Sequence, residues 1–527
     1  MDANWILHLL AGFSSTILLV RSLRRRVWGF ALAALPAVVA SGLGFFFWRD
    51  HAGYIAGALW GGLVIAPILG QRVVGRLLRQ QRFGAAARFD TVLRFLHPLD
   101  GWWERARLYR ALDLGQRGRI DDSTALLEQL MRSSPAHRSE AQMHLFRLRG
   151  SWEEVVAWLE DPAVADLTVL PMHLRALGEI GALERLVTLY ADRALALDRP
   201  GYVAVKNLCH LFVFAFAGRA ERVAALLDGP LADYPEPLRI FWRRTAELTT
   251  APHGPARAAL VGLLAQADAT LRLAVHRRLD YPLADPRQTL SPRAIAVLDR
   301  LAQEQDHEAR YGPAVAGFRP YATFGVMVPI LMMFVAQVLV GRHFAPEDGF
   351  LDWSESGAAL RILGAMLPSA VIAGEWWRLG AGTLLHYGPL HLVMNLMGLY
   401  VLGPYVEFAL GRVRYVIVYV VAGVGMMSIV VLLCWAGWME DNPLVGASGA
   451  IMGMVGATGA VALRGFRVAR SRVALRRLRS MALIVAWQAG FDYLTPQVSS
   501  ISHVGGAVLG FVVASGMAHR VTQGEPG

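Results

Sequence analysis

The sequence is poor in lysine and cysteine. Lys206 is the single lysine, so arginine carries nearly all the cationic charge behind the net charge of +11. This bias is typical of a GC-rich bacterial genome and says little about partners. Basic stretches with interleaved aromatic residues do not occur, so we expect no nucleic-acid binding. Cys209 and Cys434 stand in different segments and in no metal-ligand spacing, which predicts no disulfide and no cysteine metal site.

Charge is scarce as well. Charged residues make up 18% of the chain, against about 25% in ordinary soluble domains. Hydrophobic residues make up 55%, and the mean hydropathy is +0.38. The apolar residues are concentrated in stretches long enough to cross a bilayer. We predict nine spans, at residues 5–20, 27–48, 54–70, 321–341, 390–410, 415–438, 446–463, 481–494 and 501–517.

The spans divide the chain into three parts. We predict an all-α polytopic membrane protein with three N-terminal transmembrane helices in 1–75, a cytoplasmic helical domain in 80–315 and a six-span domain in 320–519. The eighth span is short and polar, because it carries Gln488 and Asp492.

The ends of the spans predict their orientation. Arginines crowd the loops 72–82 and 464–479, so these loops are expected in the cytoplasm. Residues 1–4 carry no cation and the first arginines follow the first span, which predicts an outer N-terminus and argues against a cleaved signal peptide. Counting spans then puts the acidic segments 347–355 and 440–441 outside. The expected location is the inner membrane of a bacterium.

The soluble segment contains a repeat. Gly118, Gly150, Gly181 and Gly218 each stand three residues before an acid, at spacings of 32, 31 and 37, and Gly254 marks a degenerate fifth copy. Glycine suits the end of one helix, and the acid suits the first turn of the next. The period is close to that of helix-turn-helix repeats, about 34 residues. The segment resembles a tetratricopeptide-type solenoid without its fuller signature, and an irregular helical bundle is the alternative. We expect it to dock a cytoplasmic protein partner.

Two membrane spans begin with residues that suit catalysis. Ser448 lies in Gly446-Ala-Ser-Gly449, and His503 opens the last span. By the predicted topology both lie near the outer face, at matched depth, where a histidine base can activate a serine nucleophile. Glycines one or two turns below each residue, including Gly506 and Gly510, allow close approach of the two helices. The alternative is ordinary close packing with an incidental serine and histidine, although ionisable residues inside membranes are usually functional.

A second polar group lies at the outer end of the fifth span. His391 and Asn395 are one helical turn apart, and His386 precedes them by five residues. His391 and Asn395 can present donors to one point, which suits an oxyanion hole completed by the backbone N–H of Ser448. A metal site would need a third ligand at a recognisable spacing, so we predict no metal and no cofactor.

Together these motifs resemble those of rhomboid intramembrane serine proteases, over about residues 321–517. The resemblance rests on Trp377-Arg378, His386-x4-His391-x3-Asn395, Glu407, Gly446-Ala-Ser-Gly449 and His503-Val-Gly-Gly506-x3-Gly510. It implies a Ser448–His503 dyad without an aspartate, an oxyanion hole from His391, Asn395 and the Ser448 amide, and a water-filled cavity open to the periplasm. It also implies that residues 481–494 form a mobile side gate.

The resemblance extends to supporting residues and has one departure. The outer segment 343–385 would lie partly in the membrane plane, anchored by Trp377 and Arg378, and Glu407 would be structural. Many rhomboids carry an aromatic residue one turn after the serine, and here that position is Met452. A thioether can still contact the imidazole. The three N-terminal spans and the solenoid lie outside the family's minimal core.

These features predict a serine endopeptidase that cleaves transmembrane segments of membrane proteins near the outer face. Its expected partners are transmembrane protein substrates, membrane lipids and a cytoplasmic protein docked on the helical domain. The main alternative is a rhomboid-like protein that binds membrane clients without cleaving them. A transporter is a third possibility, but it would need polar groups at mid-membrane, whereas the polar groups here gather near one face.

Overall fold

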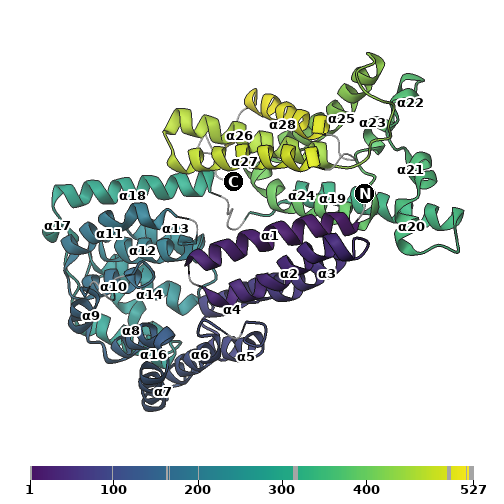
Figure 1. The fold of residues 1–527 in the computed structure, drawn as a ribbon. Coiled ribbons are helices and arrows are strands. Elements are labelled where there is room, and N and C mark those ends of the chain that lie inside the picture. The colour runs from purple at the N-terminus through teal and green to yellow at the C-terminus, as the bar shows by residue number, and fades with distance from the viewer. Residues whose placement is uncertain are drawn as a thin grey trace. The chain divides into compact units, whose positions relative to one another are not determined.

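The computed structural model describes residues 3–25, 27–97, 99–161, 164, 166–199, 201–312, 318–494, 500–517 and 519–520. The chain forms two compact units, Asp2–Ala302 and Gln303–Gly527. Every regular element in the described ranges is helical, and Figure 1 shows the helices in chain order. One isolated β-bridge joins two loops of the second unit.

The first unit begins with membrane-type helices and continues into shorter amphipathic ones. Its helices are α1 (Ala3–Arg25), α2 (Trp28–Phe47), α3 (Ala52–Trp60), the π-helix η1 (Gly61–Ile65), α4 (Ala66–Arg79), α5 (Phe83–Leu93), α6 (Trp102–Gln116), α7 (Ile120–Ser133), the 3-10 helix η2 (Pro135–His137), α8 (Arg138–Arg149), α9 (Trp152–Leu159), α10 (Leu170–Glu179), α11 (Leu183–Leu197), α12 (Val203–Phe216), α13 (Ala220–Asp228), α14 (Glu236–Leu248), α15 (Pro255–Leu263), α16 (Ala269–Asp280) and α17 (Pro286–Thr289). The next helix, α18 (Pro292–Tyr311), contains the division between the units.

The second unit contains long membrane-type helices and one irregular segment. Its helices are α19 (Tyr321–Phe344), α20 (Phe350–Glu355), α21 (Gly357–Leu363), α22 (Pro368–Ile372), α23 (Arg378–Ala381), α24 (Gly388–Leu410), α25 (Arg412–Trp435), α26 (Ser448–Ala469), α27 (Arg472–Leu494) and α28 (Ser500–Ser515). The short helices α20–α23 fill the long connection between α19 and α24.

The membrane assignment rests on the length and composition of these helices. Six described helices could span a bilayer, namely Trp28–Phe47, Ala52–Arg79, Tyr321–Phe344, Gly388–Leu410, Arg412–Trp435 and Ser448–Ala469. The other three predicted spans coincide with α1, α27 and α28, of which α28 is a shorter apolar helix. The chain is therefore an all-α, multi-pass membrane protein, as its hydropathy predicts.

Polar side chains cap the N-termini of the first membrane helices. Asn4 accepts a hydrogen bond from the Gly53 amide at 2.7 Å and donates to the Arg49 carbonyl at 2.6 Å, where α3 begins. Asp100 accepts from the Gly29 amide at 2.7 Å in the first turn of α2. Free backbone N–H groups at a helix start need such partners when water is excluded.

The repeat glycines between residues 80 and 315 lie where the sequence predicts helix ends. Gly118, Gly150, Gly181 and Gly218 have φ angles of +83°, +72°, +79° and +70°. Each separates two helices: α6 from α7, α8 from α9, α10 from α11, and α12 from α13. The left-handed conformation closes the first helix without a Cβ penalty. Gly254 differs, with φ of −80° at the start of α15.

The core of the second unit is the contact between α26 and α28. A Cβ added at Gly506 would collide with the Gly449 carbonyl, and one at Gly510 with the Gly453 carbonyl. The two backbones are therefore in direct contact, as glycine permits between membrane helices. Fifteen of the residues of α26 are buried, and no other described membrane helix has a larger buried share.

We predict that Gly510→Ala lowers the thermal stability of the detergent-solubilised protein by several degrees. The added methyl must push α28 away from α26, and overpacking of this kind typically costs about 1–3 kcal/mol. Thermal-shift measurements at one scan rate give the comparison. Gly325→Ala in α19 is the matched control, because a Cβ there meets no atom within 4 Å. Equal stability of the two variants would contradict a close contact at Gly510.

Candidate active site

Ser448 is the first residue of α26, directly after a tightly held loop. The loop pairs with the segment after α21 through hydrogen bonds between Met366 and Leu444, at 3.1 Å and 2.8 Å. The Gly446 amide then donates to the Gly382 carbonyl at 2.9 Å. At a helix start the amide of Ser448 has no partner within its own helix and can serve an incoming oxygen atom.

Gly446 brings His391 of α24 next to the serine. Its φ is +124°, which only glycine adopts readily. A Cβ at this position would lie 3.0 Å from His391 Nε2 and 3.8 Å from Ser448 Oγ. The imidazole and the hydroxyl therefore share one small space, and a side chain at position 446 would fill it.

The α26–α28 contact sets the level of His503 relative to Ser448. A Cβ at Gly449 would lie 3.5 Å from the carbonyl oxygen of Ser502, and Gly506 faces Gly449 one turn below. Residues 448 and 503 each stand one position from this contact, in the first turns of their helices. The structure thus brings the predicted nucleophile and base to the same end of one helix pair.

His503 also contacts an acid that the sequence argument does not assign to the site. Asp492 Oδ2 of α27 lies 2.8 Å from His503 Nδ1, and the Asp492 side chain is fully buried. Gln488, one turn earlier on α27, donates from Nε2 to Asp492 Oδ1 at 2.7 Å. The resemblance implies a dyad without an aspartate, whereas here a carboxylate lies against the base. The sequence signal was present in the two polar residues, four apart, of an otherwise apolar span.

Of the residues proposed for the oxyanion hole, His391 lies at this space, and Asn395 follows it by one turn of α24. Asn395 is buried and donates from Nδ2 to the His391 carbonyl at 2.9 Å, within its own helix. A carboxamide nitrogen carries two hydrogens, so a second one is available to another acceptor. The His386 ring lies edge-on to that of His391, with centroids 5.1 Å apart. Gln337 of α19 holds the His386 backbone, accepting from its N–H at 3.3 Å and donating to its carbonyl at 2.6 Å.

Comparison with known proteins finds similarity over the C-terminal part of the chain. Residues 373–520 match the family model described as Rhomboid domain. The chain carries a rhomboid domain. It is 28% identical over 219 residues to the Rhomboid protease GluP of Bacillus subtilis (strain 168), covering 41% of this chain and 38% of that protein. It is 33% identical over 180 residues to RHOMBOID-like protein 6, mitochondrial, of Arabidopsis thaliana, covering 34% and 55%.

A third relative is Rhomboid protease AarA of Providencia stuartii, which is 27% identical over 188 residues, covering 31% of this chain and 63% of that protein. The chain thus spans less than two thirds of the length of each of these relatives. No solved structure matches the chain. The matched region contains Ser448, His503 and Asp492 and excludes the helical segment before residue 303.

Trp377 and Arg378 hold the segment between α19 and α24 in place. Arg378 pairs with Glu375 at 2.6 Å and donates to the Arg361 and Ala365 carbonyls, at 2.8 Å and 3.1 Å, around the end of α21. Its guanidinium lies 4.8 Å from the Trp377 ring centroid, and that ring packs against Gly364. Arg378 thus donates hydrogen bonds to carbonyl groups at the end of a helix, and Trp377 packs beside it.

Met452 lies one turn below Ser448 in α26 and is buried. It packs in a cluster with Val455, with Met481 of α27 and with Ala507 of α28. Its side chain therefore joins three helices beneath the site.

Glu407 lies at the other end of the rhomboid domain and is fully buried. It accepts hydrogen bonds from the amides of Ala322 and Thr323, at 2.9 Å and 2.8 Å, where α19 begins. A carboxylate at a helix N-terminus satisfies free N–H groups and complements the helix dipole. The contacts agree with a structural position.

Proposed function

We propose that the protein is an intramembrane serine endopeptidase, with Ser448 as nucleophile and His503 as base. The rhomboid domain and the relatives named as rhomboid proteases support intramembrane proteolysis in general. The observation that carries the finer assignment is the glycine contact of α26 with α28, which brings residues 448 and 503 to one level beside His391. A nucleophile and a base are of use only within hydrogen-bond reach of each other.

The reaction begins when His503 Nε2 takes the proton from Ser448 Oγ. The oxygen attacks the substrate carbonyl carbon, the new O–C bond forms, and the carbonyl electrons move to the oxygen. We assign the stabilisation of this oxyanion to the Ser448 amide, His391 and the second N–H of Asn395; the nearness of His391 to Ser448 at Gly446 supports this. As the C–N bond breaks, His503 returns the proton to the leaving amine.

The acyl-enzyme is resolved by the reverse use of the same groups. His503 removes a proton from water, the hydroxide oxygen attacks the ester carbon, and the O–C bond to Ser448 breaks as the proton passes to Oγ. This step needs water at Ser448. Water can reach the residue because it lies at the end of a membrane helix.

The substrate class follows from where the serine lies. A transmembrane helix keeps its carbonyls in internal hydrogen bonds, so the cleaved segment must unwind locally. We therefore propose membrane proteins with helix-weakening glycine or proline near the cut and small residues at it. Lipid contacts surround the same helices, because many apolar side chains of α19, α24 and α25 are exposed.

The orientation of the site is part of the proposal. At the end of α26 opposite Ser448, Arg464 and Arg477 bind the carbonyls of Met517 and Tyr311, both at 3.0 Å. An arginine-rich end favours the cytoplasm. The site then opens outward, toward the periplasm in a bacterial inner membrane. The tetratricopeptide-like helical segment would lie in the cytoplasm and dock a protein partner there.

The second candidate function is a client-binding adaptor. Several relatives carry the name RHOMBOID-like without the word protease, for example RHOMBOID-like protein 6 of Arabidopsis thaliana. The serine, the histidine and the shared space at Gly446 favour the peptidase.

We predict that Ser448→Ala and His503→Ala each lower cleavage of a transmembrane substrate by on the order of 10⁴–10⁶-fold, because each removes half of the proton-transfer pair. Labelling by a fluorophosphonate probe should disappear in Ser448→Ala. Ser428→Ala is the matched control, since Ser428 lies inside α25 and donates to the Val424 carbonyl of its own helix. Wild-type cleavage by Ser448→Ala would leave the adaptor as the function.

We also predict the sidedness of thiol labelling in a background with Cys209 and Cys434 replaced by alanine. Asp348→Cys should react with an impermeant thiol reagent in intact cells, whereas Arg472→Cys should react only after permeabilisation. Both positions are exposed, whereas the neighbouring Ser471 is buried and would be a poor reporter. Labelling of position 472 from outside would move the site to the cytoplasmic face.

A further inference from the structure

The base of the proposed site is held from a third helix. Asp492 lies near the end of α27, His503 in the first turn of α28, and Ser448 at the start of α26. Asp492 Oδ2 lies 2.8 Å from His503 Nδ1, on the edge of the ring that cannot also serve the serine. The carboxylate is completely buried and the imidazole is 8% exposed, so water competes little for either.

This contact selects one form of the imidazole. A neutral imidazole carries one hydrogen, and the nitrogen that faces a carboxylate keeps it as a donor. Gln488 Nε2 also lies near Nδ1, at 3.2 Å, but the carboxylate oxygen is closer, at 2.8 Å. We therefore assign the hydrogen to Nδ1 and the lone pair that a general base needs to Nε2. Gln488 occupies the second carboxylate oxygen from one turn below, at 2.7 Å, so the carboxylate is held on both sides.

A purely structural role is the competing explanation. An acid and a histidine could simply bind α27 to α28, as polar side chains do between membrane helices. A neutral amide would do this at a lower desolvation cost than a buried carboxylate. A carboxylate has a further effect that an amide lacks, because it stabilises the imidazolium formed when the serine proton is transferred.

We propose that Asp492 is a positioning residue for His503, which makes the catalytic group Asp492–His503–Ser448 rather than a dyad. The inference rests on the proposed peptidase function. Asp492 fixes the tautomer and orientation of the imidazole and stabilises its protonated form. Gln488 in turn holds the carboxylate.

The test is the steady-state kinetics of Asp492→Asn and Asp492→Glu, in the full-length protein in detergent. Cleavage at neutral pH by Asp492→Asn should fall at least about 10-fold and up to 10⁴-fold. The loss should appear in kcat with KM little changed, because an amide neither fixes the tautomer nor stabilises the imidazolium. Asp492→Glu keeps the carboxylate and should recover part of the rate.

The controls separate this inference from the proposed function. Tyr493→Phe removes a polar atom from the next residue of α27, which is 86% exposed, and should keep wild-type kinetics. If wild type lacks any Ser448-dependent cleavage, the peptidase proposal fails. If wild type is active and Asp492→Glu is as inactive as Asp492→Asn, Asp492 only stabilises the fold and the positioning role is wrong.

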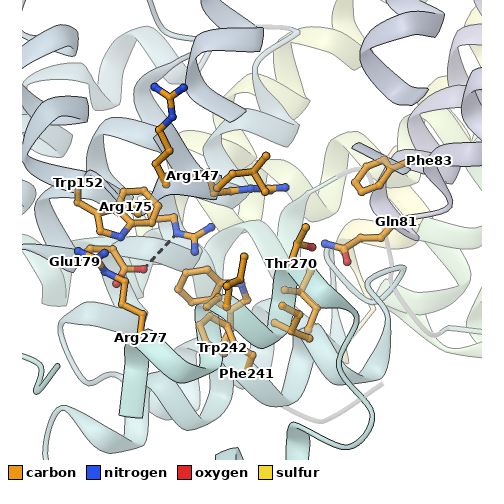
Figure 2. Close-up of a pocket in the computed structure, with 17 residues that line it drawn as sticks. Gln81, Phe83, Arg147, Trp152, Arg175, Glu179, Phe241, Trp242, Thr270 and Arg277 are labelled. Atoms are coloured by element: carbon orange, nitrogen blue, oxygen red, sulfur yellow. Dashed lines mark hydrogen bonds and ion pairs between the residues drawn. The ribbon is translucent and has the colours of Figure 1, made fainter. Parts of the chain in front are cut away.

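An independent observation concerns a pocket in the first unit. It has a volume of about 160 Å³ and opens among α8, α9, α10, α14 and α16. Four arginines line it, Arg147, Arg149, Arg175 and Arg277, against the single lining carboxylate of Glu179. Figure 2 shows these side chains around the pocket, with the Arg175–Glu179 pair marked.

The carboxylate does not balance the arginines. Glu179 is shared between Arg175, at 3.4 Å, and the buried Arg278, at 3.0 Å. Arg149 pairs outside the pocket with Glu128 at 2.9 Å. Among the residues that the structure describes, Arg147 and Arg277 make no ion pair with a carboxylate, although the charge of Asp268 acts on Arg147 and raises its pKa. The pocket therefore holds an excess of positive charge.

Burial makes this excess costly. Burial, and then the neighbouring Arg175, lower the pKa of Arg147 to about 10. Burial also lowers the pKa of Arg175, with Arg278 and Arg277 adding to the effect. The Arg175 guanidinium cannot withdraw, because the rings of Trp152 and Trp242 lie 4.9 Å and 5.2 Å from it. Fixed, desolvated cations favour an anion that replaces their lost hydration.

We propose that this pocket binds a compact oxyanion of the phosphate class. Guanidinium groups bind such oxyanions through paired N–H donors. Its volume of about 160 Å³ is sufficient for a phosphoryl group. The phosphoryl group can belong to a free phosphate ester or to a phosphorylated side chain of a docked polypeptide.

Isothermal titration of the full-length protein with inorganic phosphate, in a phosphate-free buffer of constant ionic strength, tests the site. We expect saturable binding that weakens at least about 10-fold in Arg147→Gln and in Arg277→Gln. Arg132→Gln, an exposed arginine of α7, is the control and should bind as wild type does. Tighter binding of a phosphoserine peptide than of phosphate supports the site with a polypeptide source, and equal binding supports it with a free ligand. Absent binding, or equal affinity in Arg147→Gln, overturns the proposal.

Discussion

The rhomboid domain depends on a contact in which side chains are missing. Along α26 and α28, carbonyl oxygens of one helix lie where a Cβ of the other would be, at the Gly449–Gly506 and Gly453–Gly510 pairs. Apolar burial drives little association between helices in lipid, so close backbone packing has to supply it. The same contact fixes the axial register of the two helices. A slip by one residue would turn Ser448 and His503 by about 100° relative to each other.

The other site residues are held near Ser448 and His503 by a glycine, by backbone hydrogen bonds and by an arginine. His391 reaches the serine because position 446 has no side chain and a left-handed backbone. The loop that carries Gly446 is joined to the segment between α19 and α24 by two backbone hydrogen bonds between Met366 and Leu444. Arg378 holds that segment in place by donating to the carbonyls at the end of α21. The Ser448 hydroxyl, the His391 imidazole and the loop are therefore held by one continuous set of contacts.

Much of this was accessible from the sequence, for identifiable reasons. Hydrophobic length predicts the membrane helices, and the four repeat glycines predict helix ends because only glycine closes a helix cheaply at positive φ. Ser448 and His503 could be paired because depth in a membrane can be counted along a helix. Asp492 could not be paired in this way, since His503 lies on the next helix. In the sequence, the polarity of Asp492 only weakened the prediction of a membrane span there. The division of residues 345–387 into α20–α23 was equally out of reach, because such short helices lack a periodic pattern.

Helix α27 makes polar contacts near both of its ends. At its start Arg477 donates to the carbonyls of Tyr311 and Gly312, at 3.0 Å and 2.6 Å, and its guanidinium lies over the Tyr405 ring. Fifteen residues later, about 22 Å along the axis, the same helix presents Asp492 to His503. Tyr311 is the last residue of α18, the helix that begins in the other unit. A displacement of α27 along its axis would therefore change the length or angle of the hydrogen bond between Asp492 and His503.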